Sequence, residues 1–304
     1  MGTTNFDQVQ AASFLGVDLD LNVFGETRYV STTGSDGNDG KTPSSAFLTI
    51  GAAITAAGAG GNIIIGPGTY TITSALVPLA RQLLKAAIVD QRAPTVIITG
   101  NIADLIQVDV ANVRFVGLEF KASGATADNL VDVADSAAVA GLLFYACVFN
   151  GNDQTSVVGI NNADASTAGT SITVMRCLFR DLTGTCINVG ALGWAYSLVE
   201  QNQFAIDVNS GTGIALADTT AFATGKAYVI RNNDFTGFDA TGNEVGITIA
   251  GTEDTTGAGI IRNNFFAYVG VGGGAITIDK LSPSEVNNYA GDAATGGTLV
   301  DPGT

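Results

Sequence analysis

The chain has 304 residues, of which 46% are hydrophobic and 13% charged, and its formal net charge is −15. This composition argues against a disordered chain, and the acidity disfavours nucleic-acid binding, which needs a basic face. The sequence contains no histidine, so mechanisms that need an imidazole acid, base or metal ligand are excluded.

The first segment, residues 1–26, is predicted to be an N-terminal arm outside the repeating part of the chain. It has neither the basic nor the apolar region of a signal peptide. Its scattered apolar residues, Phe6, Phe14, Leu15 and Phe24, suit packing along the body of the protein or attachment to a partner. The two alternatives are evenly matched, and attachment is our working hypothesis.

The next segment predicts a short helix that closes the end of a β structure. Thr49 can cap the N-terminus of a helix in which Ile50 and Ile54 share one face. Residues 63–65 predict a fully buried strand. The acidic stretch 36–40 has calcium-loop residue types at the wrong spacing, so we interpret it as a surface turn.

Residues 76–95 are ambiguous, because their apolar spacing fits either a short helix or a divergent turn of the repeat.

An internal repeat dominates the rest of the chain. Tyr228-Val-Ile-Arg-Asn-Asn-Asp-Phe235 returns 31 residues later as Gly259-Ile-Ile-Arg-Asn-Asn-Phe-Phe266. Weaker copies end at Phe120, Phe149, Phe179 and Phe204. Each copy is followed by an apolar-x-apolar triplet: Val131–Val133, Val158–Ile160, Ile187–Val189, Ile214–Leu216, Ile247–Ile249 and Ile276–Ile278. Short strands repeated without a helical pattern predict a parallel β-solenoid, in which each repeat forms one turn, here called a rung.

Aligning the copies predicts which residues stack from rung to rung. The phenylalanines that end the copies form one column, including Phe204, Phe235 and Phe266. Two residues earlier, the column contains Leu118, Cys147, Cys177, Asn202, Asn233 and Asn264. We expect the three asparagines to form a structural hydrogen-bonded ladder at a bend, and the cysteines to be buried free thiols rather than a disulfide.

The opening of the repeating body resembles a known superfamily. Tyr29-Val-Ser-Thr-Thr-Gly-Ser-Asp-Gly-Asn-Asp-Gly40, the segment 42–57 and Gly61-Asn-Ile-Ile-Ile-Gly-Pro-Gly-Thr-Tyr70 resemble the start of pectate-lyase-like right-handed parallel β-helix proteins, which include phage tailspikes. The resemblance covers about residues 28–72. It implies an all-β, single-stranded right-handed parallel β-helix with a short N-terminal capping helix, spanning residues 27–289 and followed by a tail, 290–304.

No catalytic residues are predicted. Enzymes of this superfamily use aspartates with a histidine, or calcium-binding carboxylates with an arginine base. In the columns four residues and one residue before the repeated phenylalanine, no two acids meet. Trp194, Arg231 and Arg262 are candidate glycan contacts. The competing interpretations are a loop anchor for Trp194, a Glu200–Arg231 ion pair, and an arginine pair relieved by Asp234. We expect no metal and no cofactor.

Two functions remain as hypotheses. The first is a non-enzymatic structural protein of a virion surface, made in the host cytoplasm without a signal peptide and attached to other virion proteins by its arm. The resemblance adds a homotrimer, and we expect no nucleic-acid or membrane partner. The alternative is a polysaccharide lyase or glycosidase that acts as a depolymerase, or a glycan-binding spike that contacts surface polysaccharide.

Overall fold

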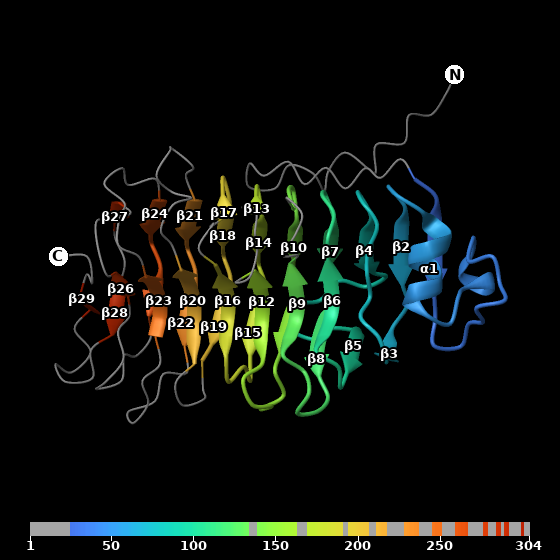
Figure 1. Cartoon of the computed structure of the whole chain (residues 1–304), viewed down its shortest axis with the longest axis horizontal. Helices are drawn as coiled ribbons and strands as arrows, with labels where there is room; N and C mark the ends of the chain where they lie inside the picture. The colour runs from blue at the N-terminus through green and yellow to red at the C-terminus, as the bar shows by residue number, and fades with distance from the viewer. Residues whose placement is uncertain are drawn as a thin grey trace, which may run out of the picture.

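In the computed structural model, three parallel β-sheets wind around one core (Figure 1). The structure describes residues 25–133, 139–162, 169–190, 194–206, 211–217, 228–236, 245–250, 259–266, 276–278, 284–286, 289–291 and 299–300. The predicted all-β parallel β-solenoid with one short α-helix is confirmed.

Each complete rung contributes one strand to each sheet, and the first rungs contribute none to sheet C. Sheet A consists of β1 (Thr27–Val30), β2 (Asn62–Ile65), β4 (Leu83–Ala86), β7 (Arg114–Val116), β10 (Leu143–Tyr145), β14 (Thr173–Met175), β18 (Leu198–Glu200), β21 (Tyr228–Arg231), β24 (Gly259–Arg262) and β27 (Ser284–Val286). Sheet B consists of β3 (Gly68–Thr71), β5 (Val96–Gly100), β8 (Glu119–Ala122), β11 (Val148–Asn150), β15 (Leu178–Arg180), β19 (Gln203–Ala205), β22 (Asp234–Thr236), β25 (Phe265–Phe266), β28 (Tyr289–Gly291) and β29 (Leu299–Val300).

Sheet C faces a third direction and consists of β6 (Asp104–Val108), β9 (Asn129–Val133), β12 (Val158–Asn162), β16 (Thr185–Val189), β20 (Thr212–Ala217), β23 (Val245–Ala250) and β26 (Ile276–Ile278). A separate two-stranded sheet pairs β13 (Gly169–Thr170) with β17 (Trp194–Ala195). The pair β28 and β29 is antiparallel, so the segment predicted as a tail contributes a strand to sheet B.

The core is built around a stack of phenylalanine rings. From Phe149 through Phe179, Phe204 and Phe235 to Phe266, successive rings are nearly parallel, with centroids 4.6–4.8 Å apart. The stack needs space on the opposite sheet, because a Cβ added at Gly213 would lie 2.6 Å from the ring of Phe235. A small residue at this point of sheet C is therefore a packing requirement of the aromatic column.

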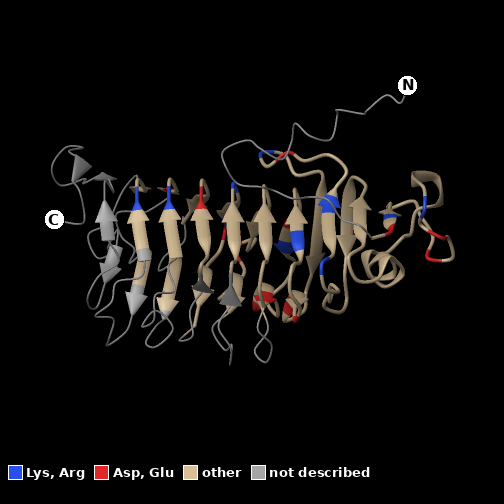
Figure 2. Cartoon of the chain, turned by 90° about the horizontal axis from the view of Figure 1, so that it is seen from above, with Lys and Arg blue, Asp and Glu red and all other residues tan. Residues whose placement is uncertain are grey.

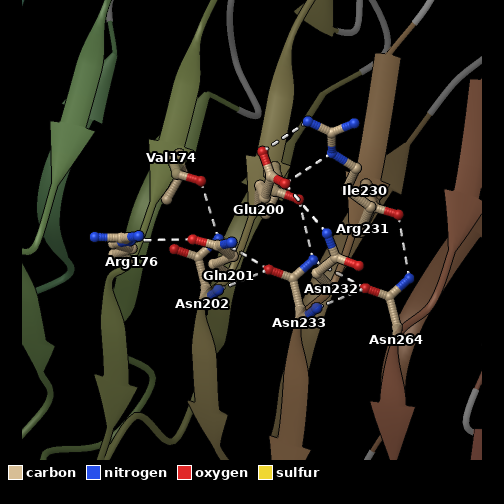
Figure 3. A network of polar contacts seen from close by, with 11 residues as sticks. Val174, Arg176, Glu200, Gln201, Asn202, Ile230, Arg231, Asn232, Asn233 and Asn264 are labelled. Atoms are coloured by element: carbon tan, nitrogen blue, oxygen red, sulfur yellow. Dashed lines mark hydrogen bonds and ion pairs between the residues drawn. The ribbon is translucent and has the colours of Figure 1, made fainter. Parts of the chain in front are cut away.

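The asparagine ladder lies at the bend between sheets A and B (Figure 3). Asn202 donates from Nδ2 to the Oδ1 atom of Asn233 at 3.0 Å, and Asn233 donates in the same way to Asn264 at 2.9 Å. Each side chain also donates to a carbonyl of the preceding rung, as Asn233 does to Val199 O at 3.0 Å. The ladder thus satisfies buried polar groups that the bend removes from the sheet.

The two cysteines of this column occupy the same place as the asparagines. Sγ of Cys147 lies 3.5 Å from Phe115 O, and Sγ of Cys177 lies 3.6 Å from Phe144 O. These carbonyls correspond, rung by rung, to those that the asparagine amides contact. Both thiols are free and buried, and burial raises the pKa of the Cys177 thiol. The thiols therefore continue the ladder with weaker donors.

The residue just before each ladder position has a left-handed backbone conformation. The φ angles are +68° at Gly117, and between +52° and +56° at Ala146, Arg176, Gln201, Asn232 and Asn263. This conformation turns the chain sharply from sheet A into sheet B, and it points the side chain of that residue away from the core. We call this row of positions the A–B corner.

The short helix closes the N-terminal end of the solenoid. Helix α1 (Ile50–Ala57) is preceded by a 3₁₀ turn, η2 (Pro43–Ser45), and the Thr49 side chain caps its first turn. Ile50 and Ile54 are buried against the first rungs. Gln82 is completely buried and donates from Nε2 to Ile54 O and Gly58 O, both at 2.8 Å. It thereby satisfies carbonyls that the end of the helix leaves open.

Several local predictions differ from the structure. Residues 76–95 form a rung with β4 rather than a helix, because Leu84 and Ala86 pack inward beside β2. In sheet C, Ile160 rather than Val158 aligns with Val131, so that triplet is shifted by two residues. The prediction was misplaced because Val158-Gly-Ile160 has the same apolar-x-apolar pattern as the triplets that do align. The strand at 63–65 is not fully buried, since Ile64 points outward.

Candidate functional site

A groove of about 350 Å³ lies outside the A–B corner. One wall is the loop 87–95, which connects β4 and β5, and this wall contributes Gln91 and Arg92. The opposite wall is formed by the corner and the start of sheet B: Leu178, Gln201, Asn202, Gln203, Asn232 and Asp234. The lining therefore combines several amides with one arginine, one carboxylate and one apolar side chain.

The corner wall is positioned by the rung geometry. Gln201 and Asn232 occupy successive left-handed corner positions, which direct their side chains outward. Gln203 and Asp234 are partners in the neighbouring strands β19 and β22, and both are exposed. Stacked rungs thus place four polar groups on adjacent turns, roughly 4.8 Å apart along the solenoid axis.

The loop wall is braced by its own polar groups. Oδ1 of Asp90 accepts the backbone N–H groups of Arg92 at 3.0 Å and Ala93 at 3.4 Å. Thr95 Oγ1 donates to Ile88 O at 3.1 Å, across the base of the loop. Ile88 is 56% exposed at the surface of this loop. These bonds give the loop a defined shape, from which Gln91 and Arg92 reach the groove.

Arginines line the corner next to the groove. Arg176 donates from Nε to Oε1 of Gln201 at 3.0 Å and from Nη1 to the hydroxyl of Tyr145 at 3.1 Å, with its guanidinium 6.0 Å from the tyrosine ring centroid. Arg231 pairs with the buried Glu200 at 2.9 Å. Figure 2 shows basic and acidic positions following each other at the ends of the sheet A strands. Arg176 is therefore held in place by uncharged partners, whereas Arg231 is neutralised.

Two of the three residues predicted as glycan contacts are neighbours in sheet A. Arg231 and Arg262 are partners in β21 and β24, but Glu200, not Asp234, balances Arg231. Trp194 lies in β17, paired with Gly169, and its side chain lies outside the described part of the structure. The candidate attachment residues Phe6, Phe14, Leu15 and Phe24 also lie outside it. Attachment through the arm therefore stays a prediction.

The sequence reasoning missed the loop 87–95 and a buried carboxylate on sheet B. Glu119 is 3% exposed, accepts a hydrogen bond from Asn150 Nδ2 at 2.8 Å and pairs with Arg180 at 3.0 Å. Arg180 lies two rungs from Glu119, and it is two residues further along its strand than Leu178, the residue that aligns with Glu119. A search within single columns could not find this pair. All its partners are internal, so we assign it to stability.

Two other polar surfaces are less suited to ligand binding. On sheet C, Asn161 donates to Asp132 at 3.2 Å and Asn188 donates to Asn161 at 3.1 Å, so these groups largely satisfy each other. A groove of about 460 Å³ beside α1 is lined by Thr and Ser hydroxyls and apolar side chains, with no charged residue. In the corner groove, Gln201 accepts from Arg176 and Asn232 donates to Glu200, but the groove also contains an arginine, a carboxylate and further amides. It therefore offers the more varied set of polar groups.

Within the part of the chain that the structure describes, no three His, Cys, Asp or Glu side chains gather in a way that could hold a metal ion. Over the same residues, no helix has the length and apolar character to cross a membrane.

No protein-family model matches the sequence, and a search of curated proteins found no match. Solved structures do match. A pectin methylesterase from Aspergillus niger aligns with a TM-score of 0.59 at 16% identity, covering 89% of this chain and 86% of that one. The PL6 family alginate lyase AlyGC aligns with a TM-score of 0.56 at 13% identity, covering 93% of this chain and 43% of that one.

A pectin methylesterase in complex with a hexasaccharide aligns with a TM-score of 0.50 at 15% identity, covering 90% of this chain and 91% of that one. Identities this low establish a shared fold only. Together with the three parallel sheets, they confirm the resemblance found in residues 28–72. The chain has the right-handed parallel β-helix fold of the pectate-lyase-like superfamily.

Proposed function

We propose that the protein binds polysaccharide chains in the groove outside the A–B corner. The observation that carries this proposal is the groove lining, in which Gln91, Gln201, Gln203 and Asn232 surround one arginine and one carboxylate. An amide group offers both donors and an acceptor, so a row of amides can bond to the neighbouring hydroxyls of a sugar ring. Leu178 adds an apolar contact for the C–H face of a sugar.

The form of the groove supports a chain-like ligand. Its polar groups repeat on successive rungs, as Gln203 and Asp234 do in β19 and β22. A polymer of sugar units can place similar hydroxyl groups at successive positions along such a row. Several weak contacts then add up along one chain, because later contacts form at a high effective concentration.

The structural neighbours favour the polysaccharide hypothesis over the virion hypothesis. The matched structures include a pectin methylesterase and an alginate lyase, enzymes named for the polysaccharides pectin and alginate. Among the described lining residues, Asp234 is the one carboxylate, whereas glycoside hydrolysis commonly uses two. Binding is therefore the function that this groove supports most directly, and turnover is tested separately.

The test is equilibrium binding to a panel of neutral and uronate-containing polysaccharides. We expect at least one to bind, and Gln203→Ala or Asp234→Ala to weaken it about tenfold each, since each removes a directional hydrogen bond. Asp128→Ala is the matched control, because Asp128 is exposed and precedes sheet C. No binding across the panel, or equal affinity of all variants, would reject the proposal.

Catalysis is measured on the same panel by the release of reducing ends or unsaturated products. We expect binding without product release. Product release that is abolished by Asp234→Asn would instead identify the groove as the active site of a depolymerase. That result would keep the site and replace the binding function with an enzymatic one.

A further inference from the structure

We propose that Val89, seated on Gly117, positions the loop 87–95 so that Gln91 and Arg92 can contact the ligand. This inference rests on the proposed polysaccharide-binding groove and identifies the element that completes it. Gln91 and Arg92 contribute one wall of the groove, yet they belong to the connection between β4 and β5. The loop therefore extends along the solenoid to reach Gln201 and Asn232, which lie several rungs further on.

Val89 of the loop packs against a single glycine, Gly117, and we call this contact the seat of the loop. A Cβ added at Gly117 would lie 2.9 Å from both Cγ atoms of Val89 and 3.1 Å from its Cβ. Contacts this short are not tolerated, so the present position of Val89 requires a residue without a side chain at 117. The later positions of the same corner, Ala146, Arg176 and Gln201, all carry side chains. Of the described corner positions, Gly117 is the one without a side chain.

The glycine is not explained by backbone conformation alone. Gly117 has φ +68°, but the equivalent Ala146 and Asn232 adopt φ +53° and +56° with side chains present. An alanine at this corner is therefore compatible with the bend. The feature that distinguishes position 117 is the contact with Val89, which connects the corner to the loop.

The braced loop transmits a shift at its seat to the groove. Asp90, immediately after Val89, holds the backbone N–H groups of Arg92 and Ala93. A displacement of Val89 consequently moves the segment that carries Gln91 and Arg92. We infer that Gly117 and Val89 act as positioning residues, whereas Gln91 and Arg92 contact the ligand.

The experiment compares Gly117→Ala, Val89→Ala and the double variant with the wild-type protein. Gly117→Ala pushes Val89 away, while Val89→Ala removes the two Cγ atoms at 2.9 Å and keeps only the 3.1 Å contact with Cβ, so the double variant relieves most of the clash. Asn263→Ala is the matched control, because it also places alanine at a left-handed corner position but does not line the groove. The unfolding midpoint of each variant shows whether the body remains folded.

Two readouts separate loop position from binding. The first is the rate of tryptic cleavage after Arg92, which needs no ligand; we expect Gly117→Ala to raise it several-fold, and the double variant to return it toward wild type. The second is affinity for the polysaccharide that binds the wild-type protein, which we expect to fall about tenfold and to recover in the same double variant.

Each outcome decides the proposal. An unchanged cleavage rate in Gly117→Ala would show that Gly117 does not position the loop, whatever the affinity for polysaccharide. Faster cleavage with unchanged affinity would overturn the role of the loop in the groove while leaving the groove itself intact. Loss of affinity that the double variant does not rescue would assign the effect to the corner rather than to the loop. A wild-type protein that binds no polysaccharide would reject the proposed function and this inference with it.

Discussion

Replacement of Asn233 by leucine tests the asparagine ladder. Asn233 is fully buried and takes part in hydrogen bonds on both sides. Its Nδ2 donates to Val199 O and to Asn264 Oδ1, and its Oδ1 accepts from the backbone N and the Nδ2 of Asn202 at 2.9 and 3.0 Å. Leucine has a comparable size but offers no polar partner.

The expected magnitude follows from the groups left without partners. Nδ2 of Asn202 keeps Val174 O, and Oδ1 of Asn264 keeps the backbone N of Asn233. The backbone N–H of Asn202 and the carbonyl of Val199 lose their ladder partners. Each buried polar group left unsatisfied costs about 1 to 3 kcal/mol, so we expect Asn233→Leu to lower the free energy of unfolding by about 2 to 6 kcal/mol.

Urea denaturation followed by circular dichroism measures this loss. Asn188→Leu is the control, because Asn188 is half-buried on sheet C and donates a side-chain hydrogen bond to Asn161. We expect its loss to stay below about 1 kcal/mol. Asn233→Cys should fall between the two, since Cys177 makes the equivalent carbonyl contact. An Asn233→Leu midpoint equal to that of the wild type would refute the reasoning.

Three further predictions concern the core, the cap and the thiols. Gly213→Val should cost at least about 2 kcal/mol, because its Cβ would meet the Phe235 ring at 2.6 Å; full stability by urea denaturation would contradict this packing. Gln82→Leu should increase amide hydrogen exchange in α1 at least tenfold, because it leaves Ile54 O and Gly58 O unpaired; unchanged exchange would show that Gln82 does not hold the helix. Burial, followed by the contact with Cys147, raises the pKa of Cys177 above the usual 9.0. The stability that the protonated thiol contributes is therefore present below pH 9 and is lost as the pH rises through the pKa of Cys177 in the folded protein. Cys177→Ala should flatten that decline of stability with pH, and an identical pH profile in both proteins would argue against it.

The sequence predicted the parts of the fold in which side chains repeat. The phenylalanine and asparagine columns could be aligned because each rung places the same residue type at the same point, as Phe235 and Phe266 illustrate. The left-handed corner could not be predicted, because its positions hold residues as different as Ala146, Arg176 and Gln201. The stacking of the rungs imposes the same left-handed backbone conformation on all of them, although they share no residue type.

The candidate groove was missed for a related reason. Its loop wall lies in residues 76–95, where the apolar spacing fitted two structures, and the loop meets rungs distant in sequence. The Glu200–Arg231 ion pair was among the interpretations that the aligned columns offered, and the structure confirms it, but no column indicated that Asp234 would face a groove. Contacts between a loop and later rungs depend on packing that no single column records.

Hydrogen-exchange mass spectrometry with bound polysaccharide tests the central claim most directly. We expect the ligand to slow exchange in two separate segments, the loop 87–95 and the corner residues 200–203 with 231–234. These segments join only in the groove. Protection confined to sheet C around Gln107 and Asp132, with the loop and the corner unchanged, would contradict the account and place the binding surface on the opposite side of the rung.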